Sequence, residues 1–158
     1  MSTKLKYTDL CVRDTREVIE LCDTWWYDTS YYEHTEIPFA TKEEAWWRLF
    51  QMGVMIGTVG RNEDGQIKSC YVASVGAYIY NDSIKDATEM VWCIDKEYRS
   101  GRNLIQLLGN IEKICRDHEV NTYSLSVPDE GHERLIDKLK MKDFFVQDVR
   151  LIKEISYG

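Results

Sequence analysis

The fold is decided by Glu97-Tyr98-Arg99-Ser100-Gly101-Arg102-Asn103-Leu104-Ile105-Gln106-Leu107-Leu108. The stretch follows a strand-like run at residues 87–94 and leads into an apolar stripe at helical spacing, made of Leu104, Leu107, Leu108, Ile111, Ile114 and Cys115. Backbone N–H groups at the start of a helix lack intrahelical partners and carry partial positive charge. Gly101 lets the backbone approach a ligand closely, and Arg99 and Arg102 add positive charge. The pattern predicts an anion site, and an ordinary loop with two solvated arginines is the alternative.

Hydrophobic periodicity and turn residues predict the elements on either side of this stretch. Thr41 followed by Glu44 is a capping-box pattern, and Asn62-Glu63-Asp64-Gly65 is a strong hairpin turn. The expected elements are strand 5–13, helix 15 to 27–30, ordered loop 30–39, helix 41–50, strands 54–59, 67–80 and 87–94, helix 104–116, strand 123–127, helix 131–139 and strand 144–155.

Helices and strands alternate only in the C-terminal half of this order, which favours a mixed sheet. We therefore expect an α/β (α+β) fold in one domain, residues 1–158, with about six strands in a mixed central sheet and about four flanking helices.

Composition and charge exclude several classes of function. The chain has 158 residues, with 20 Lys and Arg against 27 Asp and Glu and a net charge of −7. Nucleic-acid binders usually carry a basic excess, so no nucleic-acid partner is expected. No apolar run approaches the length that crosses a bilayer, and residues 1–14 contain no apolar signal core. We expect no membrane partner and a cytoplasmic location.

Cysteine and histidine positions predict neither a disulfide framework nor a metal site. The cysteines are odd in number, no two lie within four residues of each other, and they are Cys11, Cys22, Cys70, Cys93 and Cys115. We expect them to be small buried apolar residues. His34 and His132 lie far apart in the chain, without the carboxylate spacing of metal ligands, so no metal is expected.

Residues 97–108 resemble the acetyl-CoA motif of the GNAT family of N-acetyltransferases, in which Tyr and Arg precede a glycine-rich loop and a Leu-Leu helix. The order of elements resembles that fold, and residues 133–141 are similar to its late helix and turn. Residues 30–39, with aromatics before Pro38-Phe39, resemble GNAT-type proteins carried by bacteriophages, for which the location would be the host cytoplasm. The resemblance spans nearly the whole chain and implies acetyl-CoA as cosubstrate and an amine as acceptor.

The resemblance also implies roles for individual residues. Acetyl-CoA would contact Trp92, Cys93, Ile94, Arg99, Ser100, Gly101, Arg102, Asn103 and Leu104. The N–H of Cys93 or Ile94 would bind the thioester carbonyl if the strand separates from its neighbour there. Glu89 is the candidate base, acting through water, and an exposed strand carboxylate is the alternative reading. Tyr123 is a candidate acid for the departing thiolate, with His132 and Cys93 as alternatives.

The acceptor pocket is expected in the aromatic N-terminal half. One Trp of each pair, Trp25-Trp26 and Trp46-Trp47, is expected in the core, and the other lines the pocket. The predicted substrate-binding residues are Trp26, Tyr31, Tyr32 and Phe39, with core packing as the alternative role. Glu33 and Glu36 favour a cationic acceptor.

Three positions depart from the family's pattern. Glycines usually occupy the sites of Arg102 and Leu104, and a Tyr acid often occupies the site of Ile136, which cannot donate a proton. The alternative function is therefore a GNAT-fold binding or structural protein without catalysis, for example in a phage particle or against a host factor. The sequence fixes neither the acceptor nor the oligomeric state, and a homodimer is left open.

Overall fold

The computed structural model describes residues 3–127, 132–147 and 153–155. Contacts divide the chain into two units, Met1–Leu125 and Ser126–Gly158, and each is described by itself. The expectation of one domain over residues 1–158 stays a prediction.

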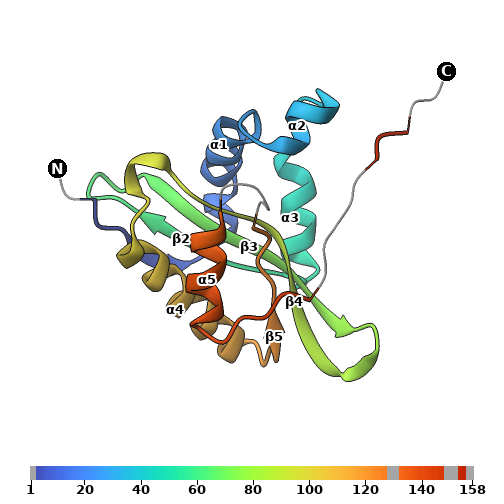
Figure 1. The fold of residues 1–158 in the computed structure, drawn as a ribbon. Coiled ribbons are helices and arrows are strands. Elements are labelled where there is room, and N and C mark those ends of the chain that lie inside the picture. The colour runs from blue at the N-terminus through green and yellow to red at the C-terminus, as the bar shows by residue number, and fades with distance from the viewer. Residues whose placement is uncertain (1–2, 128–131, 148–152, 156–158) are drawn as a thin grey trace. The chain divides into compact units, whose positions relative to one another are not determined.

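A mixed sheet forms the centre of the first unit (Figure 1). Its strands lie in the order β1 (Lys6–Asp9), β2 (Met55–Arg61), β3 (Ile67–Tyr78), β4 (Asn81–Ile94) and β5 (Thr122–Tyr123). Neighbours are antiparallel except β4 and β5, which are parallel. The α/β (α+β) class with a mixed sheet is confirmed. Five strands lie in the described residues, against about six expected.

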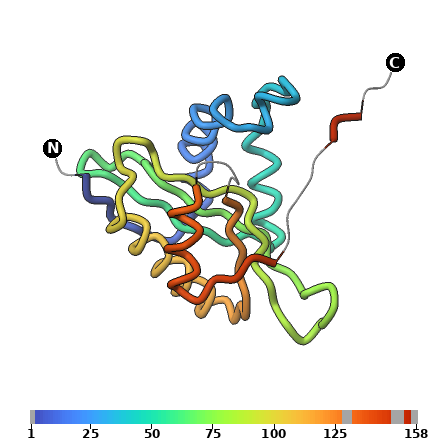
Figure 2. Tube along the Cα trace, in the orientation of Figure 1, coloured from blue at the N-terminus to red at the C-terminus, as the bar shows by residue number. Residues whose placement is uncertain are grey.

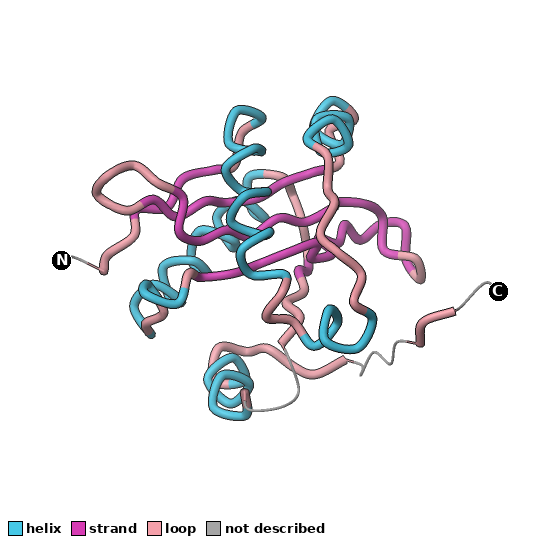
Figure 3. The backbone as a smooth tube through the Cα atoms, turned by 90° about the horizontal axis from the view of Figure 1, so that it is seen from above, coloured by secondary structure: helices cyan, strands magenta, loops and turns pink. Residues whose placement is uncertain are grey.

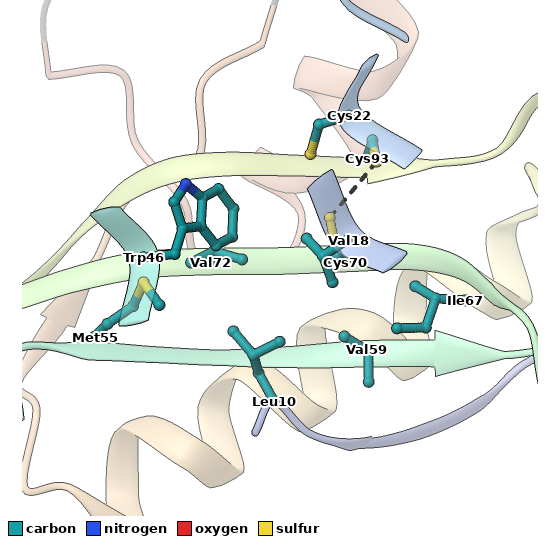
Figure 4. Packing of buried hydrophobic residues seen from close by; sticks show 10 residues of the cluster. All are labelled: Leu10, Val18, Cys22, Trp46, Met55, Val59, Ile67, Cys70, Val72 and Cys93. Carbon is teal, nitrogen blue, oxygen red and sulfur yellow. Dashed lines mark hydrogen bonds between the residues drawn. The ribbon is translucent and has the colours of Figure 1, made fainter. Parts of the chain in front are cut away.

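Helices cover both faces of this sheet. α1 (Thr15–Trp26) and α3 (Glu43–Gln51) pack on one face, and α4 (Gly101–Asp117) packs on the other (Figures 1 and 3). The α1 face holds a buried cluster, shown in Figure 4, of Leu10, Val18, Cys22, Trp46, Met55, Val59, Ile67, Cys70, Val72 and Cys93. α4 buries Leu107, Leu108, Ile111, Ile114 and Cys115, as its apolar stripe predicts.

The cysteines act as the small buried residues that the sequence predicts. All five are free thiols, and all except Cys11 are buried. Cys70 and Cys93 lie opposite each other on β3 and β4, with their Sγ atoms 3.6 Å apart (Figure 4).

A buried ion pair fastens the start of α1 to the β2–β3 hairpin. The side chain of Asp14 is 5% exposed, and its Oδ1 lies 2.6 Å from Arg61 Nη2. Glu17 Oε2 lies 3.3 Å from Arg61 Nη1, and Glu17 Oε1 accepts the Ile67 N–H. Because Asp14 is shielded from water, its charge depends on Arg61 for compensation.

The sequence predicts a loop over residues 30–39, and this is wrong for the first part of the segment, which forms the helix α2 (Ser30–Thr35). Thr29 Oγ1 accepts the Tyr32 N–H at its start. Glu36 ends the helix in the left-handed region, with φ 54°. The segment's aromatic rings pack against the end of α1, where Tyr31 and Phe39 contact Trp26 and Tyr32 contacts Tyr27.

Two helix starts also differ from the prediction. α3 begins at Glu43 after Lys42, without a side-chain cap, so the predicted Thr41–Glu44 capping box is wrong. α4 begins at Gly101 rather than Leu104, because Ser100 Oγ accepts the Asn103 N–H and caps the helix earlier.

Strand lengths depend on pairing more than on local pattern. β1 ends at Asp9, where the short 3-10 helix Val12–Asp14 soon follows, so the predicted strand 5–13 is too long. β4 begins at Asn81, earlier than the predicted 87, because it pairs with β3 as far as Tyr78. Figure 2 shows the resulting β3–β4 hairpin extending beyond the other strands. β5 covers only two residues, so the predicted strand 123–127 is also too long.

The turn between β2 and β3 is confirmed. The Gly65 N–H donates to the Asn62 carbonyl, and Gly65 has a φ of 81°, which favours glycine.

The second unit contains α5 (Glu133–Lys140), which confirms the helix predicted at 131–139, apart from Gly131, which lies outside the described residues. Residues 144–147 and 153–155 are not strand, so the predicted strand 144–155 is wrong there, and residues 148–152 lie outside the described residues. In the part of the chain that the structure describes, no helix has the length and apolar character needed to span a membrane.

Candidate active site

The start of α4 leaves backbone donors without partners. Ser100 is the N-cap, and its Oγ accepts the Asn103 N–H at 3.2 Å. The N–H groups of Gly101 and Arg102 have no acceptor among the described residues, as helix geometry predicts for a first turn. A Cβ added at Gly101 meets nothing within 4 Å, so open space lies beside these donors. This arrangement suits an anion.

Asn103 has a structural role at this loop. It is fully buried, its Oδ1 accepts the Leu5 N–H at 3.3 Å, and its Nδ2 donates to the carbonyls of Thr3 and Tyr98, each at 2.7 Å. Its own N–H is capped by Ser100. Asn103 therefore holds the loop against the N-terminal segment, and its predicted contact with acetyl-CoA stays a prediction.

A β-bulge interrupts β4 just after Glu89. Val72 pairs with Val91 and Ala73 pairs with Glu89, so Met90 is an extra residue. Before the bulge, the strand residues with odd numbers face β5: the Ala87 carbonyl accepts the N–H of Ser124, and the Glu89 N–H donates to Ser124 Oγ at 3.1 Å.

Beyond Glu89 the two strands separate. The pairing of β5 with β4 is limited to Asp86 and Ala87, while β3 continues to pair with β4 as far as Ile94. The β4–β5 ladder thus ends before the bulge, and Ile94 lies on the β4 edge beyond it, which is called the open edge here. This is the separation that the resemblance requires for a thioester to reach the backbone of β4.

The bulge decides which backbone groups face this open edge. The Asp95 N–H donates to the Lys68 carbonyl, and antiparallel pairs alternate, so Cys93 exchanges its hydrogen bonds with Cys70. The N–H and C=O of Cys93 therefore face β3. The same groups of Trp92 and Ile94 face the open edge, where Arg99 Nε donates to the Ile94 carbonyl at 3.0 Å. Of the two predicted thioester donors, Ile94 presents its N–H to the open edge and Cys93 presents its N–H to β3, and the contact with a thioester stays a prediction.

Glu89 and Tyr123, the two predicted catalytic residues, both lie where β4 and β5 separate. Tyr123 pairs with Ala87, two residues before Glu89, and its ring packs edge-on against Tyr71 at a centroid distance of 6.2 Å. Burial raises the pKa of Tyr123 well above its usual range. Burial is also the main reason that the pKa of Tyr71 is raised, and the charge of Glu89 adds to it. A raised pKa disfavours proton donation, and the role of Tyr123 as the acid stays a prediction.

A pocket of about 180 Å³ lies between the end of α1 and the loop after β4. Its lining includes Trp25, Asp28, Cys93, Ile94, Lys96 and Arg99. Lys96 Nζ pairs with the Asp28 carboxylate and lowers its pKa, chiefly through their hydrogen bond. Sequence reasoning missed Asp28 and Lys96, because they are far apart in the chain and no local pattern joins them.

The predicted acceptor residues gather into an aromatic patch around Trp26. The Trp26 ring lies 5.3 Å from Tyr31 and 6.0 Å from Phe39, and its Nε1 donates to the Ile37 carbonyl. Tyr32 instead packs against the ring of Tyr27, at 4.8 Å.

One Trp of each pair packs in the core, as the sequence predicts, and a role of the other in an acceptor pocket stays a prediction. Trp46 is buried in the core cluster and Trp25 packs against it. Trp26 lies in the aromatic patch, and Trp47 is 40% exposed.

No family model and no curated protein matches the chain. Solved structures do share its fold. An aminoglycoside acetyltransferase from an uncultured soil metagenomic sample, in complex with trehalose, matches with a TM-score of 0.74 at 14% identity, over 96% of this chain and 97% of that one. A glucosamine-6-phosphate N-acetyltransferase from Arabidopsis thaliana matches with a TM-score of 0.67 at 14% identity, over 97% and 99%. An acetyltransferase of Trypanosoma brucei matches with a TM-score of 0.67 at 14% identity, over 96% and 100%.

At these identities the likeness establishes architecture. Within that architecture, this chain has a bulge in β4, a parallel pairing of β4 with β5, and backbone donors at the start of α4. The chain has the fold of the GNAT N-acetyltransferases.

Proposed function

We propose that the protein is an acyl-CoA-dependent N-acetyltransferase that moves an acetyl group from acetyl-CoA to a primary amine. The observation that carries the proposal is the open edge of β4, which leads directly to the uncapped donors at the start of α4. One surface thus offers backbone groups for an extended amide-containing arm and N–H donors for the phosphates at its end.

The chain's own groups fit such a ligand. The N–H groups of Gly101 and Arg102 would bind the pyrophosphate, with the charges of Arg99 and Arg102 beside it. The Ile94 N–H would donate to the thioester carbonyl, since it faces the open edge and has no acceptor among the described residues.

Acyl transfer then needs one bond formed and one broken. The amine nitrogen attacks the carbonyl carbon, the new C–N bond forms, and the C–S bond breaks. Negative charge develops on the carbonyl oxygen, where the Ile94 N–H would stabilise it. The amine proton passes to Glu89, directly or through a water, and the departing thiolate takes up a proton. Ile136 cannot supply that proton, and burial makes Tyr123 a poor donor.

The acceptor that fits is a cationic amine. Residues 20–44 hold seven acids and one Lys, whereas the rest of the chain holds twenty acids and nineteen bases. Asp23, Glu33, Glu36 and Glu44 form no ion pair within residues 3–127, 132–147 and 153–155. The aromatic patch around Trp26 lies in the same segment, and aromatic faces attract ammonium groups. A similar protein, the soil aminoglycoside acetyltransferase, was also solved in complex with sisomicin.

The second candidate is a GNAT-fold binding protein without catalysis. Two departures from the family's pattern favour this candidate. Ile136 stands in place of a proton donor, and Arg102 and Leu104 carry side chains where the family's motif has glycines. The first candidate requires both binding and turnover of acetyl-CoA, whereas the second requires no turnover and, as a structural protein, no binding of acetyl-CoA.

Binding and turnover are therefore measured separately. Acetyl-CoA at a hundredfold its Kd should stabilise the fold by about 2.7 kcal/mol in a thermal shift assay. Release of the CoA thiol is then followed with cationic, neutral and anionic primary amines. Binding without thiol release for any amine supports the second candidate, and no binding at millimolar acetyl-CoA rejects the first.

Glu89→Gln tests the base. We expect kcat to fall by about 10²- to 10⁴-fold while the Kd for acetyl-CoA is unchanged, because the amine proton loses its acceptor. Glu63→Gln, an exposed acid in the β2–β3 turn, is the matched control and should leave both quantities unchanged. Unaltered turnover in Glu89→Gln would remove Glu89 from the mechanism.

A further inference from the structure

A chain of polar contacts connects the start of α4 to β4 through the hydroxyls of Tyr7 and Ser69. Ser69 on β3 is fully buried, and its Oγ donates to the Cys93 carbonyl at 3.0 Å. Tyr7 Oη donates to Ser69 Oγ at 3.1 Å and lies 3.2 Å from the Asn103 carbonyl. Ser69 and Tyr7 therefore place polar contacts directly behind the open edge.

This chain fixes the peptide group that matters for acyl transfer. The Cys93 carbonyl and the Ile94 N–H belong to one planar trans peptide, so they point in opposite directions. When Ser69 holds the carbonyl toward β3, the Ile94 N–H is held toward the open edge. On the other side of Ile94, Arg99 Nε holds the next carbonyl at 3.0 Å. Side-chain donors thus fix both peptides of Ile94.

The Ser69 hydroxyl is not needed to satisfy the carbonyl that it contacts. Cys93 and Cys70 are a hydrogen-bonded pair of the β3–β4 ladder, so the Cys93 carbonyl already accepts the Cys70 N–H. The second donor adds restraint on the orientation of the peptide. A fixed peptide orientation favours catalysis when its N–H must stabilise the negative charge that develops on a carbonyl oxygen, because the N–H then needs no rearrangement during the reaction.

We propose that Ser69 is a positioning residue for acyl transfer, acting through the Cys93–Ile94 peptide to aim the Ile94 N–H at the thioester oxygen. The proposal rests on the acetyltransferase function proposed above. Tyr7 supports Ser69 from behind when its single hydroxyl proton goes to Ser69 Oγ and not to the Asn103 carbonyl, because the Ser69 proton is then left for Cys93.

The same sheet offers a matched control. Thr58 on β2 is also fully buried, and its Oγ1 donates to the Thr8 carbonyl at 2.8 Å, on the far side of the sheet order from β4. Ser69→Ala and Thr58→Ala each remove one buried hydroxyl that donates to a strand carbonyl. A purely structural role predicts the same behaviour for both variants.

The experiment compares these two variants in denaturant stability, acetyl-CoA affinity by calorimetry, and kcat at saturating amine and acetyl-CoA. We expect both to lose stability to a similar degree and to bind acetyl-CoA within about twofold of the wild type, since the phosphate donors are untouched. Only Ser69→Ala should lower kcat, by about tenfold, less than the 10²- to 10³-fold known for deleting a donor outright. Equal kcat values for Ser69→Ala and Thr58→Ala would overturn the proposal.

If Ser69→Ala does not fold, the variant Tyr7→Phe tests the same proposal. It leaves the Ser69–Cys93 bond in place but frees the Ser69 hydroxyl to rotate, so kcat should fall by about two- to threefold with acetyl-CoA affinity unchanged. Unchanged kcat in Tyr7→Phe would then count against the proposal. A wild-type protein without turnover refutes the proposed function. If the wild type is active and Ser69→Ala and Thr58→Ala have equal kcat values, only the role of Ser69 is refuted.

Discussion

A single backbone donor at the start of α4 can be removed without disturbing the helix. Gly101 is its first residue, and Pro is favoured at that position because the N–H there has no intrahelical partner. The residue before a Pro must be extended, and Ser100 already is, with φ −150° and ψ 156°. Gly101→Pro therefore deletes one N–H from the predicted pyrophosphate site and leaves the fold intact.

The size of the effect follows from the hydrogen bond that is lost. A hydrogen bond to a charged group contributes about 1.5 to 3 kcal/mol, and each 1.4 kcal/mol corresponds to tenfold in Kd. We expect Gly101→Pro to weaken acetyl-CoA binding by about 10- to 150-fold. Its melting temperature without ligand should be at or above that of the wild type, because Pro restricts the unfolded chain.

Gly101→Ala is the matched control, since it retains the N–H and its Cβ enters space with nothing within 4 Å. Titration calorimetry with acetyl-CoA measures all three proteins, and Gly101→Ala should bind within about twofold of the wild type. Wild-type affinity in Gly101→Pro would show that the phosphates bind elsewhere. Equal losses in both variants would show that the space at Gly101, and not its N–H, is what the ligand needs.

Three further predictions concern stability. Arg61→Met should cost about 3 to 5 kcal/mol in urea unfolding, because it removes the cation 2.6 Å from the buried carboxylate of Asp14 and leaves only the exposed Arg13, at 4.0 Å; a cost below 1 kcal/mol would mean that Arg13 or water compensates the charge. Gly57→Ala should cost about 1 to 3 kcal/mol or more, because its Cβ would lie 2.4 Å from the Tyr71 carbonyl oxygen, and a neutral effect would contradict that close approach. Burial raises the pKa of Tyr7 to about 12, so its contribution to stability is complete below its unfolded pKa of about 10 and is lost as the pH rises toward 12. Tyr7→Phe should reduce the slope of unfolding free energy against pH in that window by up to about 1.4 kcal/mol per unit, and an unchanged slope would contradict the assignment.

Much of the fold could be read from local sequence because local forces decide it. The apolar stripe from Leu104 to Cys115 predicts α4, since a helix with that spacing has one face to bury. Asn62 to Gly65 predicts the β2–β3 turn, since Gly65 takes a positive φ without cost. The short helix α2 was harder to predict, because six residues with a Thr cap give no measurable period.

The loop and helix start of the candidate site were predictable from sequence, but the orientation of the backbone groups beside them was not. Arg99 to Leu104 marks the end of α4 at which an anion would bind, whatever the rest of the chain does. Whether Cys93 or Ile94 presents its N–H depends on the extra residue at Met90, and a bulge appears only when β4 is paired with β3. Ser69 could not be found from sequence, because a lone Ser in a strand has no pattern that links it to Cys93.

By itself, then, the sequence determined the helix α4, the loop before it and the fold class, because these follow from the periodicity of apolar residues and the geometry of helix ends. Only the tertiary structure decided where β4 and β5 separate, which of Trp92, Cys93 and Ile94 face the open edge, and that Asp28 meets Lys96. The physical reason is that strand pairing alternates with a period of two, so one bulged residue reverses the direction of every backbone group beyond it.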